Sequence, residues 1–284
     1  MLKEQQHKTK SLLEDLTFGL EVEQVGISRY QGSALAAINL SYTGREKWKQ
    51  VHDGSIQGGR SGSEFVSGIM NWSSIEKVQE SVRLIREKGG RAHSSCGVHV
   101  HIDGSRFLRD PKALIRLIKV VDKYERHMYH ALRSTNRMSN SGWSKPVCQD
   151  FLNRVCALKN PTIEDIRDEW YQGDPRWQRR YHSSRYRLLN LHALFNKGTV
   201  EFRCFNSTVH AGKIKAYIQL CGLICAQALL TKRCSKGQRR FDESKAKYEV
   251  RTWLIRLGAI GDEYRTMRHH LTNHLQGDST YHRA

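Results

Sequence analysis

Two histidines and an aspartate alternate with apolar residues in the run Cys-Gly-Val-His-Val-His-Ile-Asp, which spans 96–103. Successive side chains of a β-strand point to opposite faces, so His99, His101 and Asp103 would share one face and the apolar residues the other. The apolar face can pack on helices. Imidazoles and a carboxylate held side by side on a rigid strand are typical of a metal site, which would need further ligands from other strands.

Three other stretches repeat this alternation and carry acidic side chains opposite their apolar residues. They are Glu21 and Glu23 within 16–23, Glu64 at the start of a predicted strand at 64–69, and Glu201 with Arg203 within 199–205. Glu21 and Glu23 would be neighbours on one strand face, and because like charges repel, something cationic should lie between them. The alternative for 16–23 taken alone is a solvated edge strand.

If these strands belong to one sheet, their polar sides form a single face and their apolar sides pack on helices. Four carboxylates and two histidines on one face would repel strongly without cations. An oxygen-rich set with one or two imidazoles suits Mg²⁺ or Mn²⁺ better than structural Zn²⁺. Arg203, beside Glu201, is placed to bind a phosphoryl group or a carboxylate. The set therefore points to phosphoryl transfer by positioning and charge neutralisation.

Hydrophobic periodicity predicts the elements that must position these residues. Helices are predicted at 75–85 (capped by Ser73 or Ser74), 111–128 (starting at Asp110-Pro111), 147–158, 162–171, 214–225 and 250–257. A turn at 196–198 predicts a β-hairpin between strands at 185–192 and 199–205. We expect a polar lead-in or short helix at 1–15, loops at 26–47, and a hairpin loop rather than a phosphate loop in the glycine-rich turn at 57–63.

Size and charge limit the kind of protein this can be. The chain has 284 residues, 38% of them hydrophobic, which is enough for a core in one large domain or two small ones. A formal charge of +19 implies attraction to polyanions or phosphate-rich ligands. Seven cysteines without a Cys-x-x-Cys pair indicate reduced thiols. With no signal-like start and no apolar run near the ~20 residues that span a bilayer, we expect a soluble cytoplasmic protein without a membrane partner.

As an ordered set, the polar stretches resemble a known family. The motifs are Phe18-Gly19-x-Glu21-x-Glu23, Asp53-Gly54-Ser55 with Glu64 downstream, Cys96-Gly97-x-His99-x-His101, and Gly198-Thr199-Val200-Glu201-Phe202-Arg203. Together, over about residues 16–230, they resemble the amidoligase family, small relatives of glutamine synthetase and glutamate–cysteine ligase. The chain is far shorter than glutamine synthetase, and no adenine-binding motif is identifiable in it.

The resemblance implies an α+β fold with a curved, mainly antiparallel β-sheet backed by helices, as in the glutamine synthetase catalytic domain. Residues 1–284 would form one catalytic domain, with a helical or loop insertion at about 133–180 and a basic helical extension from about 232. The implied reaction uses ATP and two or more Mg²⁺ or Mn²⁺ ions. ATP would phosphorylate a carboxylate substrate, such as glutamate or a related amino acid, and an amine substrate would attack the acyl phosphate to give an amide.

The resemblance also assigns roles to individual residues. The metal ligands would be Glu21, Glu23, Glu64, His99 and Glu201, with His101 behind His99. Arg203 and Arg187 would bind phosphate and the substrate carboxylate, and Asp53 would lie near the incoming amine. Residues expected at the nucleotide are Glu21, Ser55, His101 and Arg203. The 133–180 insertion is expected to keep water from the acyl phosphate, with Trp143, Trp170 and Trp177 as its cover.

Two other classes of function remain open on the residues alone. The first is a metal-dependent amide or ester hydrolase built on His-x-His, although here that pair follows two acidic strands and the late element is Glu-x-Arg. Product formation without ATP would favour it. The second is a nucleic-acid-binding or nucleic-acid-modifying protein, suggested by the charge of +19. A basic surface is compatible with ligase activity, because it can recruit a polyanionic or acidic macromolecule as the substrate.

Overall fold

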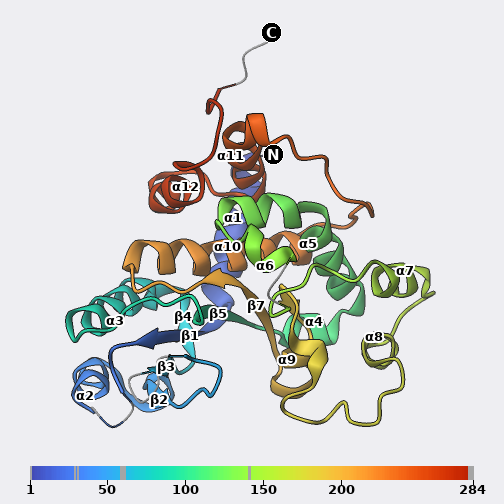
Figure 1. Ribbon diagram of the computed structural model, residues 1–284. Coiled ribbons are helices and arrows are strands. Elements are labelled where there is room, and N and C mark those ends of the chain that lie inside the picture. The colour runs from blue at the N-terminus through green and yellow to red at the C-terminus, as the bar shows by residue number, and fades with distance from the viewer. Residues whose placement is uncertain (1, 29, 31, 58–61, 140–141, 281–284) are drawn as a thin grey trace.

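A computed structural model describes residues 2–28, 30, 32–57, 62–139 and 142–280 (Figure 1). Its centre is a seven-stranded sheet in the order β2-β3-β1-β5-β7-β6, with β4 paired to β1 beside this path. The strands are β1 (Thr17–Val25), β2 (Lys49–Val51), β3 (Gly62–Val66), β4 (Met70–Asn71), β5 (Gly97–Asp103), β6 (Leu189–Asn190) and β7 (Thr199–Asn206). All the strand pairs are antiparallel. The α+β class and the mainly antiparallel sheet packed against helices are therefore confirmed.

Helices pack on the apolar side of the sheet and extend beyond it. They are α1 (Leu2–Asp15), α2 (Ser33–Asn39), α3 (Ile75–Glu87), α4 (Ser105–Arg109), α5 (Pro111–Ala131), α6 (Thr135–Ser139), α7 (Gln149–Ala157), α8 (Ile163–Tyr171), α9 (His192–Lys197), α10 (Ala211–Leu230), α11 (Ala246–Leu257) and α12 (Arg265–Thr272). Helix α10 is the central one, in contact with α1, α3, α5, α12 and strand β5. Both termini lie on the side away from the β2–β3 edge of the sheet (Figure 1).

Local sequence signals explain where several of these helices begin. The Asp110 carboxylate accepts a hydrogen bond from the Ala113 N–H and Pro111 occupies the first turn, so α5 starts where it was predicted. Helix α8 begins with a capping box in which Thr162 and Asp165 exchange side-chain and backbone hydrogen bonds. Ser74 ends a short 3₁₀ turn (Trp72–Ser74) and directly precedes α3, but its side chain makes no capping hydrogen bond.

Two predicted segments have a different structure. Residues 33–39, expected in a loop-rich stretch, form α2, in which Ala34 and Ile38 are buried. The expected hairpin strand at 185–192 is reduced to β6, because residues 183–185 form a 3₁₀ helix and His192 begins α9. Gly198 ends α9 in the left-handed conformation (φ 73°), so the glycine terminates a helix rather than a two-residue turn. Residues 58–61 of the glycine-rich turn lie outside the described residues.

We expected no apolar run long enough to span a membrane, but helix α10 is such a run. It is 20 residues long and apolar enough to cross a bilayer by length and composition, among the residues that the structure describes. However, most of its side chains are buried inside the protein, as expected of the core helix of a globular fold. The expectation that no such run exists is therefore corrected, but the helix itself is a packing element. All seven cysteines are free thiols, as expected.

Candidate active site

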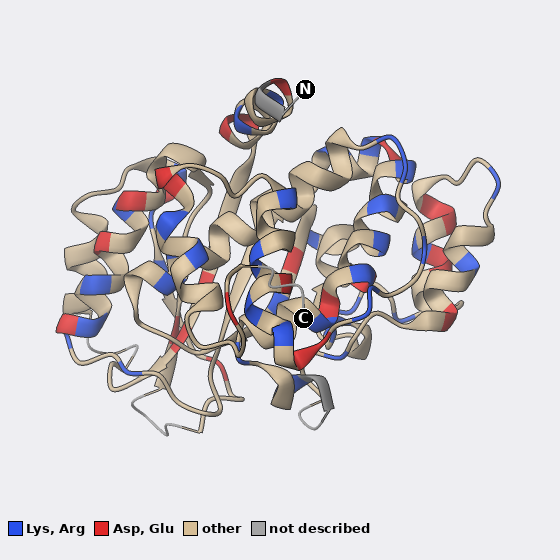
Figure 2. Cartoon of the chain, turned by 90° about the horizontal axis from the view of Figure 1, so that it is seen from above, with Lys and Arg blue, Asp and Glu red and all other residues tan. Residues whose placement is uncertain are grey.

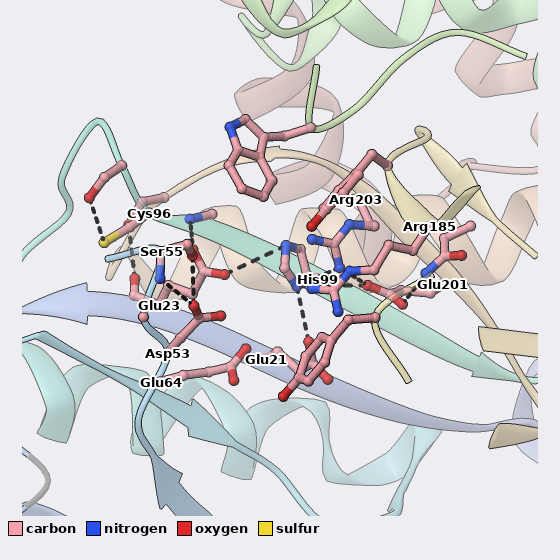
Figure 3. A pocket seen from close by; sticks show the side chains of 18 of the residues that line it. Glu21, Glu23, Asp53, Ser55, Glu64, Cys96, His99, Arg185, Glu201 and Arg203 are labelled. Atoms are coloured by element: carbon pink, nitrogen blue, oxygen red, sulfur yellow. Dashed lines mark hydrogen bonds and ion pairs between the residues drawn. The ribbon is translucent and has the colours of Figure 1, made fainter. Parts of the chain in front are cut away.

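The register of the sheet brings the predicted polar residues together on one face. Glu21 lies opposite His99 on the neighbouring strand, Glu23 lies opposite Glu64, and His101 lies opposite Glu201. Because directly opposed side chains on a sheet point the same way, the strands β3, β1, β5 and β7 contribute to one continuous floor. Figure 3 shows the side chains of Glu21, Glu23, Glu64, His99 and Glu201 pointing from the strands toward a common space.

A β-bulge places Arg203 in this site. Val98 pairs with Phe205 and Val100 with Phe202, so two residues of β7, Arg203 and Cys204, lie opposite the single His99. In a strictly alternating strand, Phe205 would share the polar face with Arg203. The extra residue restores Phe205 to the buried core while the arginine remains beside Glu201. Sequence alternation alone could not reveal this insertion.

His99 lies between the two glutamates of β1. Its Nδ1 is 3.0 Å from Glu21 Oε2 and its Nε2 is 3.8 Å from Glu23 Oε1. The Gly97 N–H donates a hydrogen bond of 2.5 Å to the other oxygen of Glu23. The pKa of Glu21 lies well below its usual value, because the attraction of His101 and His99 outweighs the opposing effect of burial. The imidazole of His99 therefore lies between Glu21 and Glu23, at the place where a cationic group was expected.

His101 lies beside the carboxylates of Glu21 and Glu201 but is not among the described residues that line the cavity above the floor. Its Nδ1 is 2.9 Å from Thr199 Oγ1, and its Nε2 is 3.2 Å from Glu21 Oε1 and 3.9 Å from Glu201 Oε2. Burial lowers the pKa of His101, but the carboxylates of Glu201 and Glu21 raise it by more. The buried Nε2 is near these oxygens yet has no hydrogen bond of good geometry to any described residue. This unsatisfied atom faces Glu21 and Glu201.

Glu201 and Arg203 form a buried ion pair at the other end of the floor. Arg203 Nη1 donates to Glu201 Oε1 at 2.5 Å, and Asn190 Nδ2 donates to Oε2 at 2.7 Å. Burial would raise the pKa of Glu201, but Arg203 and then His101 hold it at about 2. Arg203 is charged, and its Nε has no hydrogen-bond partner among the described residues. The guanidinium can therefore still donate to a ligand.

A second acidic group lies toward the β3 end of the floor. Carboxylate oxygens of Glu23, Asp53 and Glu64 can approach one another within 4.8 Å. Asp53 accepts hydrogen bonds of 2.7 Å from both the N–H and the Oγ of Ser55. Burial raises the pKa of Glu64 to about 9, helped by the negative charges of Glu21, Glu23 and Asp53. A cation here would relieve this repulsion.

Three overlapping groups of side chains could hold a metal ion. They are Glu21, His101 and Glu201; Glu21, Glu64 and His99; and Glu23, Asp53 and Glu64, with the ligand atoms of each group within 4.8 Å of one another. Glu21 and Glu64 each belong to two groups, as bridging carboxylates between neighbouring ions would. The donors are mainly carboxylate oxygens with one imidazole in each of two groups, which suits Mg²⁺ or Mn²⁺. The residues present therefore fit divalent cations.

The floor lies at the bottom of a cavity of about 1210 Å³, above the usual size of a small-ligand pocket. Its walls come from the loop 51–57, from 92–97 and from the segment 178–186. Cationic wall residues that the sequence interpretation missed are Arg137, Arg180, Arg185 and Lys197. Arg180 and Arg185 are signalled in the sequence by the dense arginine content of 176–187, whereas Lys197 lies in a segment without arginine.

The structure does not bring every predicted residue into this cavity. Arg187 donates a hydrogen bond of 2.8 Å to the Pro146 carbonyl and is not among the described residues that line the cavity, whereas Arg185 is. Trp143 lines the cavity. Trp170 instead packs edge-on against Phe151, with ring centroids 5.0 Å apart. Asp103 accepts from Ser105 at the start of α4 and also lies outside the lining.

Trp177 is likewise separate from the cavity lining, since its ring packs near Tyr171 and beneath the Arg167 guanidinium. Of the three predicted cover tryptophans, only Trp143 is among the described lining residues. The aromatic residues that accompany it are Tyr181 and Tyr186. Tyr186 makes an edge-on contact with Trp143 at 4.9 Å, and Arg185 lies over both tyrosine rings.

The site is an acidic, histidine-bearing floor with arginines at one end, built on an antiparallel sheet, and its donor set fits divalent cations. The family described as "Putative amidoligase enzyme" matches residues 14–225, which is most of the chain. The chain therefore belongs to this family. No curated protein matches the chain.

Proposed function

We propose that this protein is an ATP-dependent carbon–nitrogen ligase that joins a carboxylate to an amine through an acyl phosphate. The observation that carries the proposal is the continuous floor from Glu64 to Arg203, acidic at one end and cationic at the other, in a member of the amidoligase family. The proposal includes the curved, glutamine synthetase-like form of the sheet. It also includes glutamate or a related amino acid as the acid.

The chemistry requires an activated acid. A carboxylate is a poor electrophile at neutral pH, because its leaving group would be oxide, and phosphorylation by ATP supplies phosphate as a better one. Divalent ions held by Glu21, Glu23, Glu64, His99 and Glu201 would neutralise charge on the phosphates. His101 joins this set, because its unsatisfied Nε2 faces Glu21 and Glu201.

Arg203 would hold the transferring phosphoryl group. Glu201 fixes one of its terminal nitrogens, so the planar guanidinium is pre-oriented before ATP binds. Arg185 lines the same cavity. It would therefore replace Arg187 as the second arginine that binds the phosphate and the substrate carboxylate. A guanidinium on the floor and another on a wall of the same cavity can bind both the phosphate and the substrate carboxylate in bidentate geometry.

The acidic end of the floor would receive the amine. An amine arrives mainly as an ammonium ion, which Asp53, beside the metal-holding Glu23 and Glu64, would attract. The nitrogen can attack only after it loses a proton, and Asp53 is the acceptor that we assign to it. The Ser55 N–H and hydroxyl hold one oxygen of Asp53, which orients the carboxylate in the loop.

The acyl phosphate must be kept from water, because hydrolysis would waste ATP. Trp143, Tyr181 and Tyr186 supply the aromatic part of the cavity lining. They would cover the reacting atoms once both substrates are bound. The large cavity also accepts an amine or acid that is part of a bigger molecule.

A hydroxamate assay tests the proposal without knowledge of the natural amine. Protein, ATP and Mg²⁺ or Mn²⁺ are mixed with a panel of carboxylic acids and hydroxylamine, which traps an acyl phosphate. We expect equal amounts of ADP and acyl hydroxamate with at least one acid, and neither product with Glu21→Gln. Glu76→Gln, an exposed glutamate on α3, is the matched control and should retain activity. Cleavage of an amide or ester in the absence of ATP, with no hydroxamate, would replace the ligase by a hydrolase.

A further inference from the structure

A second cavity lies outside the catalytic floor, and its lining is strongly basic. It has a volume of about 550 Å³ and is bounded by α5, by the end of α7 with the connection to α8, and by residues 232–235. Its cationic lining residues are Lys112, Arg116, Lys119, Lys232 and Arg233, and no acidic side chain is among the described residues that line it. We call this cavity the basic groove. It shares no lining residue with the catalytic cavity.

One side of the groove is a regular row of cationic residues on α5. Lys112, Arg116, Lys119 and Lys123 recur at intervals of four, three and four residues, which places them along one face of the helix. At 1.5 Å per residue, this row is about 16 Å long. The acidic residues of the helix, Asp122 and Glu125, are buried. Neither is among the described residues that line the groove, although Asp122 is near enough to add to the rise in pKa that burial gives the Cys234 thiol in the lining.

The other side of the groove is the segment 232–235, which follows α10. Lys123 Nζ donates a hydrogen bond of 2.5 Å to Ser235 Oγ, and the Arg239 N–H donates one of 2.9 Å to the Lys123 carbonyl. These contacts hold the segment against α5, so its own exposed cations, Lys232 and Arg233, face the same groove. Arg239 and Arg240 continue the exposed basic run beyond it.

Placing so many like charges together costs stability, because each cation repels its neighbours. Local carboxylates offset little of this: Asp110 pairs with Arg116 at 3.2 Å, and the pair is at the edge of the groove. The blue segments of Figure 2 show how widely Lys and Arg are distributed over the helices and loops of the molecule. A concentrated row of this kind is the electrostatic footprint of a polyanion-binding surface.

We propose that the basic groove binds the phosphate backbone of a nucleic acid. The row on α5 is about 16 Å long, which is enough to contact successive phosphates along one strand of a duplex. A protein partner would call for aromatic anchors at its centre, but none of the described residues that line the groove is aromatic. Lysine and arginine rows without aromatic platforms fit backbone contacts, which position a nucleic acid without reading its sequence.

The groove binds independently of the ligase reaction, since its residues are absent from the catalytic floor. It would keep the enzyme on a nucleic acid or on particles that contain one. The whole chain carries a charge of +19, so the test must separate this groove from diffuse attraction by the rest of the surface.

The experiment compares two variants of the full chain that lose the same charge. The groove variant is Lys112→Gln, Lys119→Gln, Lys232→Gln and Arg233→Gln; Arg116 and Lys123 stay, because they bond to Ala228 and Ser235. The control variant is Lys10→Gln, Arg83→Gln, Arg86→Gln and Lys88→Gln, all exposed and on α1 or α3 or just after α3. Binding of a fluorescent duplex of about 20 base pairs is measured by anisotropy across a salt series.

We expect the groove variant to bind at least about tenfold more weakly at low salt, and its slope of log affinity against log salt to be smaller by about 3. The control variant should stay close to wild type in both. Circular dichroism confirms that both variants are folded. Equal losses in both variants, no loss in either, or no duplex binding by the wild type at low salt would each overturn the proposal. So would binding of polyglutamate, but not of the duplex, at this groove.

Discussion

Individual side chains in this site are defined by the charges that they face. Glu21 is shared between two histidines, and Glu64 carries a pKa of about 9 because burial and three carboxylates act together on it. Glu201 is held at a pKa of about 2 by Arg203. Glutamates on the same floor therefore differ in protonation. Glu64 lies at the acidic end, which is poor in cations, and Glu201 lies at the end where Arg203 pairs with it.

Glu21→Gln is the sharpest test at this scale. The substitution keeps the shape of the side chain but removes a charge shared by two of the ligand groups, so activity in the hydroxamate assay should fall at least about a hundredfold. The protein should stay folded, because the Glu21 side chain is 17% exposed and lines the cavity. Near-normal activity in this variant would remove the floor from the mechanism. Glu201→Gln is less clean, since it leaves the buried Arg203 charge uncompensated and should cost stability of about 3 kcal/mol.

Arg203→Lys and Arg187→Lys form a matched pair. Both keep the positive charge, but a lysine cannot reproduce the planar fork of the guanidinium. We expect Arg203→Lys to reduce turnover by about a hundredfold. Arg187→Lys should stay within about threefold of wild type, because Arg187 donates to the Pro146 carbonyl outside the cavity. Steady-state kinetics of the two purified variants distinguish them, and equal losses would contradict the placement of Arg187.

Irregular features of the fold, and not only regular strands, position these residues. The bulge in β7 keeps Arg203 on the floor and Phe205 in the core, and the short helix α9 takes the place of a hairpin turn before β7. Residues 133–180 contribute Arg137 and Trp143 to the cavity, while their helices α7 and α8 pack together to the side of the sheet (Figure 1). Helix α5 is anchored to this segment by buried polar contacts.

One of these contacts makes stability depend on pH. Glu125 accepts hydrogen bonds from the Val147 N–H and from Gln238 Nε2, but burial, assisted by Asp122, raises its pKa to about 7. The folded state therefore holds a proton that the unfolded chain releases near pH 4.5. This contribution is fully present below about pH 4.5 and is lost as the pH rises through 7, which amounts to about 3 kcal/mol.

Glu125→Gln should remove this dependence, since a glutamine keeps the shape and stays neutral. We expect the variant to have a higher free energy of unfolding than wild type at pH 8, with a difference that shrinks toward pH 4.5. Urea unfolding at several pH values measures it. Glu164→Gln, an exposed glutamate on α8, is the control and should follow the wild-type curve. A Glu125→Gln curve parallel to wild type would show that this carboxyl does not titrate as described.

The whole molecule separates two kinds of charge. Carboxylates are concentrated on the floor of one large cavity, while lysines and arginines dominate elsewhere and give a formal charge of +19. The floor is a region of repulsion within the folded state, because its carboxylates were brought together from three strands and a loop. A divalent cation would bind the folded chain and not the unfolded one, so metal binding and folding are linked.

Mn²⁺ should therefore stabilise the protein without any substrate. At a hundred times its dissociation constant, a single bound ion adds about 2.7 kcal/mol, or roughly 5–10 °C in melting temperature. Glu64→Gln should reduce this shift, because Glu64 belongs to two of the ligand groups, whereas Glu76→Gln should not. Differential scanning calorimetry with Mn²⁺ or a chelator measures the effect. An identical melting temperature under both conditions would argue against resident metal sites.

The sequence by itself determined the strands that carry chemistry and the family to which the chain belongs. Alternation is a local property, so it showed that Glu21, Glu23, His99, His101 and Glu201 leave their strands opposite the core. The tertiary structure decided what alternation cannot show. The strand order placed His99 between Glu21 and Glu23, the bulge kept Arg203 on the floor, and chain folding chose Arg185 over Arg187. Such outcomes depend on register and on contacts between distant segments, which no local pattern encodes.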